Sequence, residues 1–294
     1  MVKVLFGILL LFSFSFGAQD QNELQDEFQD EAQETLEKEN KLKLKIKSFI
    51  DADVYEQNSA FIDIIFSPES DYYINDRVDS VKVIHTLKEN GLLNLFFKQP
   101  SELKLSFKSS GPPLFFVKIM GDTLRNIGYY RYVTQESTLN NSEFTWTISL
   151  NAEYATDPLV LSRELSKSGC SIIDIQRNSS TDWTYIIDMR EGLLNIPKLE
   201  DGVEVKLKRS LYAHWLNISN IEKLEIAGSR RNDWYPYIAY YDRSLHLLKV
   251  IKKDRKIRKI RLRIPKNAYY IKISDLYTLK NIRDALVLTP LGSR

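Results

Sequence analysis

The chain has 294 residues, of which 43% are hydrophobic and 27% charged, and its formal net charge is +2. This balance excludes a fully disordered or fibrous chain, and the length predicts about two domains of roughly 150 residues each. The small net charge conceals a segregation, because the residues from Glu200 onward hold 21 Lys and Arg against 10 Asp and Glu.

Residues 1–18 have the composition of a secretory signal peptide. Lys3 is the only charge, the run from Val4 to Phe16 is almost entirely apolar, and Gly17 and Ala18 supply small side chains for cleavage. The run is too short to cross the roughly 30 Å of hydrocarbon in a bilayer. With a single cysteine and a composition typical of an AT-rich bacterial genome, we expect a soluble periplasmic protein.

Residues 19–40 are predicted to form an acidic helix or linker. Asp20 to Glu39 holds nine carboxylates and one lysine, and its few apolar residues recur every four positions. The sequence leaves three alternatives open. The segment is a solvated helix or partly disordered linker, a coiled-coil or docking helix, or a segment that folds back on the basic C-terminal half.

Residues 41–190 are predicted to be an α+β region. Lys41 to Lys47 alternates strictly between Lys and apolar residues, and Phe61 to Phe66 is a short apolar run, so both are expected to be strands. An α-β-β pattern then occurs three times. Each helix ends in Leu-x-x-x-Gly, typical of a left-handed C-terminus, at Leu87–Gly91, Leu124–Gly128 and Leu165–Gly169.

Caps and strands complete the three copies. Helix starts are predicted at Asp76, at Gly111-Pro112-Pro113 and at Thr156-Asp157-Pro158. The strands expected after each glycine are 93–97 and 103–107, 130–132 and 144–150, and 173–175 and 183–187. This order predicts one or two ferredoxin-like α/β sandwich modules. Modules of this kind often bind partners by adding a strand at a sheet edge.

Residues 191–202 are expected to be a linker, and residues 203–294 an all-β sandwich. Seven short strand-like runs are predicted there, at 203–207, 224–226, 235–241, 245–251, 257–264, 269–273 and 286–288. The run from Trp234 to Asp242, with the strand patterns at 260–265 and 270–273, resembles galactose-binding-like (discoidin-type) β-sandwich modules. The resemblance implies a carbohydrate or envelope-polymer binding module and carries over no site residues.

Two surfaces are candidates for binding. Lys249 to Arg263 carries nine basic residues, and the outer side chains Lys256, Arg258, Arg261 and Arg263 are expected to attract an anionic partner. The alternative is a solvated hairpin that protects a sheet edge. Trp234, Tyr235 and Tyr237 are either core residues or a sugar-stacking or protein-binding platform.

The sequence offers no positive evidence for an enzyme. It contains no metal-ligand spacing, no phosphate-binding loop and no nucleophile elbow, so no catalytic residue, metal or cofactor is predicted. Cys170 follows a capping glycine and is expected to pack as a small apolar residue. We therefore expect a periplasmic binding or scaffold protein whose partner is an envelope protein or an anionic or glycan polymer, not nucleic acid. Peripheral membrane contact and the oligomeric state stay open, and the alternative is a cell-wall glycan-binding or glycan-processing protein.

Overall fold

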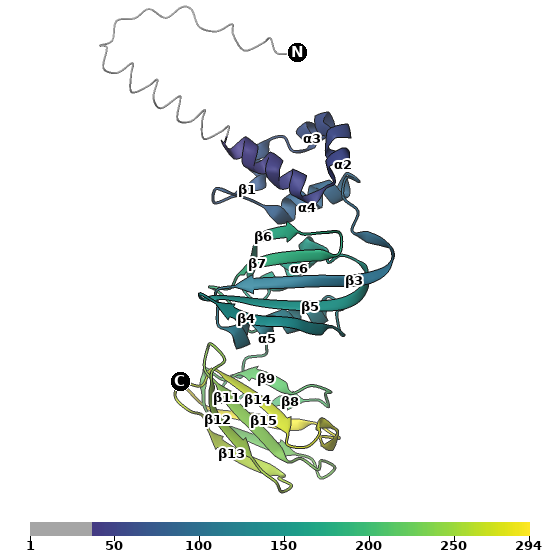
Figure 1. The fold of residues 1–294 in the computed structure, drawn as a ribbon. Helices are drawn as coiled ribbons and strands as arrows, with labels where there is room; N and C mark the ends of the chain where they lie inside the picture. Colours follow the sequence, from purple (N-terminus) through teal and green to yellow (C-terminus); the bar gives the residue numbers. More distant parts are fainter. Residues whose placement is uncertain (1–36) are drawn as a thin grey trace, which may run out of the picture. The chain divides into compact units, whose positions relative to one another are not determined.

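The computed structural model describes residues 37–294 of the protein (Figure 1). The predicted signal peptide and most of the predicted acidic segment lie outside the described residues. The chain divides into two compact units, one ending at Leu93 and the other comprising Asn94–Arg294. Helices and several sheets occur together, which confirms the predicted α+β class.

The unit that ends at Leu93 is mainly helical. It contains a helix over residues 37–49, α2 (Ala52–Gln57), α3 (Ser59–Ile65), a 3-10 turn (Glu69–Tyr72), the short strands β1 (Tyr73–Ile74) and β2 (Arg77–Val78), and α4 (Ser80–Glu89). The helix N-cap of α4 is Asp79, whose carboxylate accepts from the N–H groups of Val81 and Lys82, and not the predicted Asp76. Asp76 lies instead in the turn between β1 and β2, with φ +61°.

Both strands predicted in this unit are wrong, because the two segments are helical. In the first segment Leu42, Ile46 and Phe49 are buried, whereas Leu44 is 67% exposed. The side chains that reach the core are therefore spaced by four and three residues, which is the period of a helix. Lys does alternate with apolar residues over 41–47, but the apolar residues do not all face the core. Leu42 and Ile46 are buried, whereas Leu44 points to solvent.

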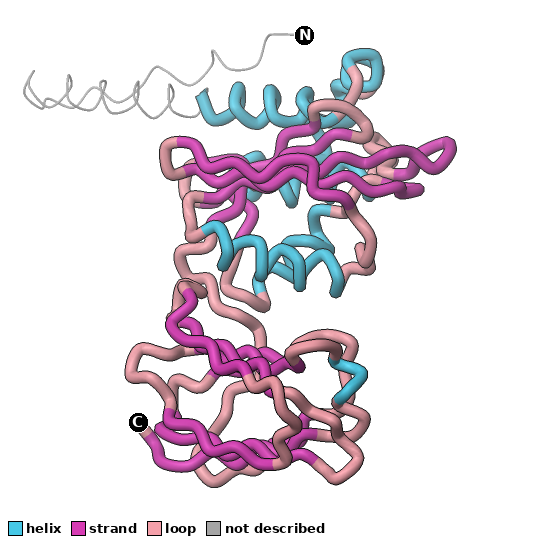
Figure 2. The backbone as a smooth tube through the Cα atoms, turned by 60° about the horizontal axis from the view of Figure 1, so that its bottom comes forward, coloured by secondary structure: helices cyan, strands magenta, loops and turns pink. Residues whose placement is uncertain are grey.

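The second unit begins with a five-stranded sheet in the order β4-β5-β3-β7-β6. Its strands are β3 (Phe96–Ser109), β4 (Val133–Asn140), β5 (Glu143–Tyr154), β6 (Ser171–Arg177) and β7 (Asp182–Asp188). Only the β3–β7 pair of this sheet is parallel. The helices α5 (Pro113–Asn126) and α6 (Pro158–Ser166) cover one face of the sheet (Figure 2).

The predicted helix ends of the α-β-β pattern are confirmed. Gly91, Gly128 and Gly169 have φ values of +72°, +103° and +65°. The residue after each glycine donates its N–H to the carbonyl of the leucine five residues earlier, at 2.9, 2.8 and 3.2 Å respectively. This bond defines the Schellman motif. The predicted starts of α5 and α6 are also confirmed, each with a proline in its first turn.

The strands that follow these glycines are only partly as predicted. Residues 93–95 and 130–132 have no strand structure, and β3 and β4 begin at Phe96 and Val133. In the third copy both predicted strands form, as β6 and β7. The first two copies reach their sheet through an irregular segment, although the residue after the glycine makes the same turn-closing bond in all three copies.

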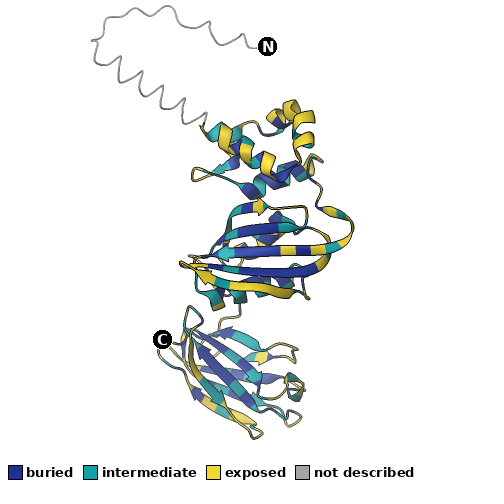
Figure 3. Ribbon diagram, in the orientation of Figure 1, coloured by how far each residue is buried: buried dark blue, intermediate teal, exposed yellow. Residues whose placement is uncertain are grey.

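Two four-stranded sheets follow, in the orders β13-β10-β15-β8 and β12-β11-β14-β9. Their strands are β8 (Val205–Leu207), β9 (His214–Asn217), β10 (Ile221–Gly228), β11 (Pro236–Tyr241), β12 (Leu247–Lys252), β13 (Lys259–Arg263), β14 (Tyr270–Asp275) and β15 (Leu286–Ser293). Buried side chains of both sheets form one hydrophobic core, and burial alternates along the strands (Figure 3). Leu199, inside the predicted linker, also belongs to this core.

Candidate binding surface

Strand β13 presents the basic side chains that the sequence singles out. Lys259, Arg261 and Arg263 are exposed, while Leu262 between them is buried in the core. β13 is an edge strand of its sheet and pairs with β10, so that Arg261 stands opposite Glu225 and Arg263 opposite Lys223. These outer side chains of β13 and β10 form what we call the basic face: Lys223, Glu225, Lys259, Arg261 and Arg263.

Glu225 neutralises part of the basic face. Its carboxylate lies 2.5 Å from the Nζ atom of Lys259 and accepts from the Nε atom of Arg261 at 2.6 Å. Hydrogen bonds from Lys259 and Arg261 hold the pKa of Glu225 below its ordinary value, so this carboxylate is charged at neutral pH. Arg261 is 80% exposed and uses one of its five N–H donors on Glu225, which leaves others directed to solvent.

Arg263 and Lys223 make up the uncompensated part of the basic face. Within residues 37–294, neither has a carboxylate at ion-pair distance. A hollow of about 270 Å³ lies here, lined by residues of both strands and by Leu291, whose side chain is exposed. A second hollow of about 350 Å³ extends past Arg263 to Lys266 and Arg294, and the acidic Glu222 also lines it. An anionic group in either hollow meets two or more cations and one carboxylate, that of Glu225 in the first hollow and that of Glu222 in the second.

The other two predicted cations lie outside the basic face. The Nζ atom of Lys256 is 2.8 Å from the Oδ1 atom of Asp233, and the Oδ2 atom of the same carboxylate accepts from Arg283 at 3.0 Å. Arg258 precedes β13, where its carbonyl accepts from the N–H of Gly228 at 2.7 Å. The structure therefore brings Arg261 and Arg263 together on one strand and leaves Lys256 and Arg258 in the preceding loop.

The predicted aromatic residues do not form one platform. Trp234 is 0% exposed and donates its indole N–H to the carbonyl of Ser274 at 2.9 Å, so it is a core residue and not a surface one. Tyr235 pairs edge-on with Tyr277, at 5.0 Å between ring centroids. Tyr237 lies on the outer side of β11, where the Nζ atom of Lys252 is 5.4 Å from its ring centroid.

Lys223, Glu225 and Lys259 were not singled out from the sequence. Lys223 and Glu225 flank Leu224 at the start of the predicted strand 224–226, which is confirmed as part of β10, so their outward direction follows from alternation. Their place opposite Arg263 and Arg261 depends on the pairing of β10 with β13, which are separated by β11 and β12 in the chain. No local pattern in the sequence specifies that pairing.

Cys170 is buried in a setting that disfavours the thiolate. Its Sγ atom lies 3.5 Å from the carbonyl oxygen of Ser168. Burial, together with the charge of Asp188, raises the pKa of the Cys170 thiol to about 11. The thiolate is the nucleophilic form of cysteine, and the raised pKa disfavours this form at neutral pH. This environment is that of a packing residue.

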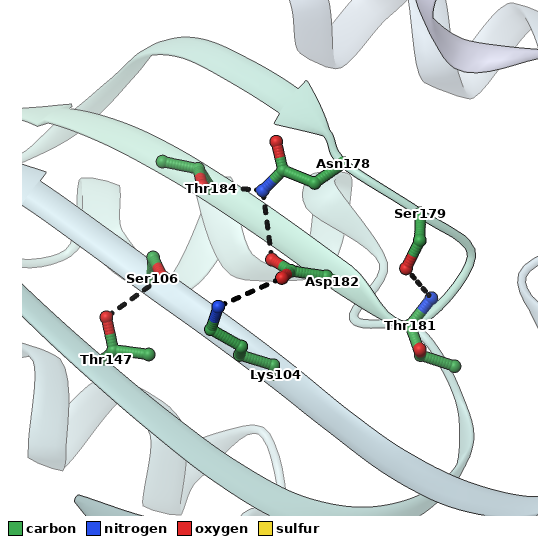
Figure 4. Close-up of polar contacts among 8 residues, drawn as sticks. All are labelled: Lys104, Ser106, Thr147, Asn178, Ser179, Thr181, Asp182 and Thr184. Carbon is green, nitrogen blue, oxygen red and sulfur yellow. Dashed lines mark hydrogen bonds and ion pairs between the residues drawn. The ribbon is translucent and has the colours of Figure 1, made fainter. Parts of the chain in front are cut away.

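Polar side chains on the five-stranded sheet bind one another through hydrogen bonds and an ion pair (Figure 4). The hydroxyls of Ser106 and Thr147 are 3.0 Å apart across β3 and β5. Lys104 donates to Asp182 at 3.1 Å, and Asn178 donates to the same carboxylate at 2.9 Å. The partner of Ser106 is a hydroxyl and not a base, so this network supports the sheet and supplies no activated serine.

The remaining titratable groups form no metal-binding cluster in the described part of the chain. Residues 37–294 contain no group of three His, Cys, Asp or Glu side chains placed to hold a metal ion. Burial lowers the pKa of His214, which keeps that imidazole neutral at neutral pH. His246 is bonded to Asp242 at 2.9 Å within a single hairpin.

Comparison with known proteins found no match to a family model, to a curated protein or to a solved structure. Across residues 37–294 no helix combines the length and the apolar composition needed to cross a membrane. The geometry of the described residues therefore carries the functional argument alone.

Proposed function

We propose that the chain is a non-enzymatic binding protein of the bacterial envelope, and that its basic face binds an anionic partner. The observation that carries this proposal is the outer side of β13 and β10, where four cations surround the single carboxylate of Glu225. Regular strands hold these cations in place, and the core does not depend on them because Leu224 and Leu262 provide the inward face. Clustered cations of this kind attract anionic partners over about a Debye length.

The fold assignment belongs to the same proposal. The five-stranded sheet with α5 and α6 on one face is a variant of the ferredoxin-like α/β sandwich, in which a parallel β7 lies beside β3. The two four-stranded sheets that share one core form a β-sandwich of the galactose-binding-like type. The periplasmic location rests on the composition of residues 1–18.

The alternative function is binding or processing of cell-wall glycan. Its main support was the aromatic run at Trp234, and Trp234 is buried and so cannot stack on a sugar at the surface. Tyr235 and Tyr237 remain available, but their rings contact different neighbours, Tyr277 and Lys252. Stacking on tyrosine and electrostatic attraction differ in their response to salt, because raising the ionic strength shortens the Debye length from about 10 Å at 0.1 M to about 3 Å at 1 M.

The experiment measures retention of the whole protein on purified sacculi and on phosphatidylglycerol vesicles across a salt series. We expect the double variant Arg261→Gln and Arg263→Gln to lower affinity about tenfold or more at 0.1 M salt, since each surface cation contributes about 1 kcal/mol to binding an anionic surface. The variant Arg230→Gln and Arg231→Gln removes the same charge from an exposed loop and serves as the matched control.

Retention that is indifferent to salt and to the Arg261 and Arg263 changes contradicts the proposal. If retention is instead abolished by Tyr237→Ala, the glycan alternative is correct. Binding to vesicles but not to sacculi identifies acidic lipid as the partner, and the reverse result identifies a cell-wall polymer.

A further inference from the structure

The exposed edges of the sheets are protected unequally. An unpaired edge strand is a template for pairing with another chain, and proteins blunt such edges with Lys, Arg or Pro, or keep them short. In the described residues, β6, β12 and β13 each carry Lys or Arg, and β8 and β9 have three and four residues. The remaining edge strand of the three larger sheets is β4, the longest at eight residues.

Strand β4 has almost none of these protections. Its sequence from Val133 to Asn140 contains no Lys, Arg or Pro, and its only charge is Glu136. A bulge between Thr134 and Glu136 interrupts the pairing with β5, but the register is regular from Glu136 to Asn140. Val133 and Leu139 are 62% and 59% exposed. The strand therefore presents an open backbone edge with apolar side chains at both ends.

A cationic, aromatic cleft lies at the N-terminal end of β4. It has a volume of about 550 Å³ and shares Val133 with the strand. Its remaining walls include Arg125, Arg131, Tyr130 and Tyr212, and none of its lining residues is acidic. Arg125 is held in place, because its guanidinium lies 4.7 Å from the ring centroid of Tyr212 and donates to Asp122 at 3.1 Å. Arg131 is exposed and has no carboxylate partner in residues 37–294.

We infer that β4 and this cleft form one binding site for an extended peptide that adds as a strand beside β4 and ends in an acidic residue. The inference specifies how the α/β part of the proposed binding function takes a partner, and it does not involve the basic face. Antiparallel pairing is slightly more stable per residue than parallel pairing. In that orientation the C-terminal end of the peptide arrives beside Val133, where the guanidinium of Arg131 meets its carboxylate.

The chemistry of the two parts defines the peptide. Backbone hydrogen bonds along Glu136–Asn140 give affinity without regard to sequence, and side chains that alternate on the added strand give specificity. Glu136 disfavours an acidic residue opposite the middle of β4, whereas the cleft favours one at the end. The partner is therefore an extended segment with neutral, β-prone residues and an acidic C-terminal end.

The test uses the full chain and two synthetic peptides with an N-terminal fluorophore. One consists of four Thr-Val repeats followed by Asp-Asp, and the other has the same repeats followed by Lys-Lys. We expect the Asp-Asp peptide to bind about fivefold more tightly or better in fluorescence anisotropy, which is the effect of one favourable ion pair. Hydrogen exchange followed by mass spectrometry should show new protection in residues 133–140 when this peptide binds.

Two variants separate the parts of the site. Arg131→Glu should abolish or reverse the preference for Asp-Asp, whereas Arg230→Glu, an equal charge change in an exposed loop, should leave it intact. Leu139→Lys adds an edge-protecting lysine and should weaken both peptides while the circular dichroism spectrum is unchanged. The double change of Arg261 and Arg263 to Gln should not alter peptide binding. A negative result for the β4 site can therefore be distinguished from a negative result for anion binding by the basic face.

Three results would overturn the inference. The first is no binding of either peptide. The second is binding without new protection in residues 133–140. The third is a dimer in sedimentation velocity that Leu139→Lys converts to a monomer, because β4 would then be paired with a second copy of the chain.

Discussion

Cys170 shows how a single residue that attracts a catalytic interpretation is explained by its backbone position. It is the residue after Gly169, and its N–H closes the Schellman motif by donating to Leu165 at 3.2 Å. Leu92 and Tyr129 make the same bond after Gly91 and Gly128, with no thiol. The position therefore requires an N–H group and accepts Leu, Tyr or Cys, and the raised pKa of the Cys170 thiol is a consequence of the burial of this side chain.

We predict that Cys170→Ala destabilises the protein by about 1 kcal/mol and leaves binding by the basic face unchanged, because a small apolar side chain keeps the position dry. The wild-type thiol should resist iodoacetamide at pH 7.5 in the native chain and react in urea. Thermal unfolding, sacculus retention and mass spectrometry of the alkylated protein measure these outcomes. Complete loss of binding with an unchanged melting temperature would revive a functional thiol.

At the scale of elements, the sequence predicts helix ends better than it predicts the elements that precede or follow them. A Leu-x-x-x-Gly helix end depends on one residue that adopts the left-handed backbone conformation, so a short stretch of sequence is enough to predict it. The alternation over Lys41–Lys47, by contrast, fits a strand as well as a helix. Only the burial of Leu42 and Ile46, with Leu44 exposed, distinguishes the helix from the strand. That choice depends on packing within the unit, which a short sequence window does not contain.

Two of the glycines that end these helices, Gly128 and Gly169, are predicted to differ in their tolerance of a side chain. A Cβ atom at Gly169 would lie 2.4 Å from the backbone oxygen of Glu191, whereas at Gly128 nothing lies within 4 Å. Strain alone would make Gly128→Ala the worse change, since φ +103° is further from the left-handed helical value of about +57°. The clash should reverse this order, with Gly169→Ala costing about 3 kcal/mol and Gly128→Ala about 1 to 2 kcal/mol.

Urea unfolding followed by tryptophan fluorescence compares the two variants, since Trp146 and Trp183 lie in the same sheet that both helices cover. An equal or larger cost for Gly128→Ala would mean that the segment at Glu191 moves aside. In that case the contact between this segment and α6 is not a fixed part of the fold.

At the scale of the whole molecule, the sequence predicts which strands are basic or buried but not which strands meet. The exposed alternation of Arg261 and Arg263 is readable because each second residue of β13 is apolar. The contribution of Lys223 and the partial neutralisation by Glu225 depend on long-range pairing across two intervening strands. For the same reason the cleft at β4, which combines Arg125, Arg131 and Tyr212 from separate segments, has no signature in the chain.

The last prediction concerns the segment 191–202, which joins the five-stranded sheet to the two four-stranded sheets. The hydrophobic core of the latter includes residues from Leu199 to Leu288 and none from the five-stranded sheet. Each side therefore has the apolar packing that an independently stable fragment needs. Glu191 and Glu200 are both exposed at the ends of the segment, and Glu89 is exposed near the end of the first unit at Leu93.

A protease that cleaves after glutamate should accordingly cut first at Glu89, Glu191 or Glu200, and should leave resistant fragments on both sides of 191–202. Glu136 and Glu143 are also exposed but lie in β4 and β5, where backbone pairing slows cleavage, so they are internal controls. Mass spectrometry of a time course identifies the order of cuts. A resistant fragment that spans 191–202 would show that this segment joins the two sides into one folding unit. Its bond from Leu193 to Ser168 and its bond from Leu199 to Asn217, each 2.9 Å, would then both be stable parts of that unit.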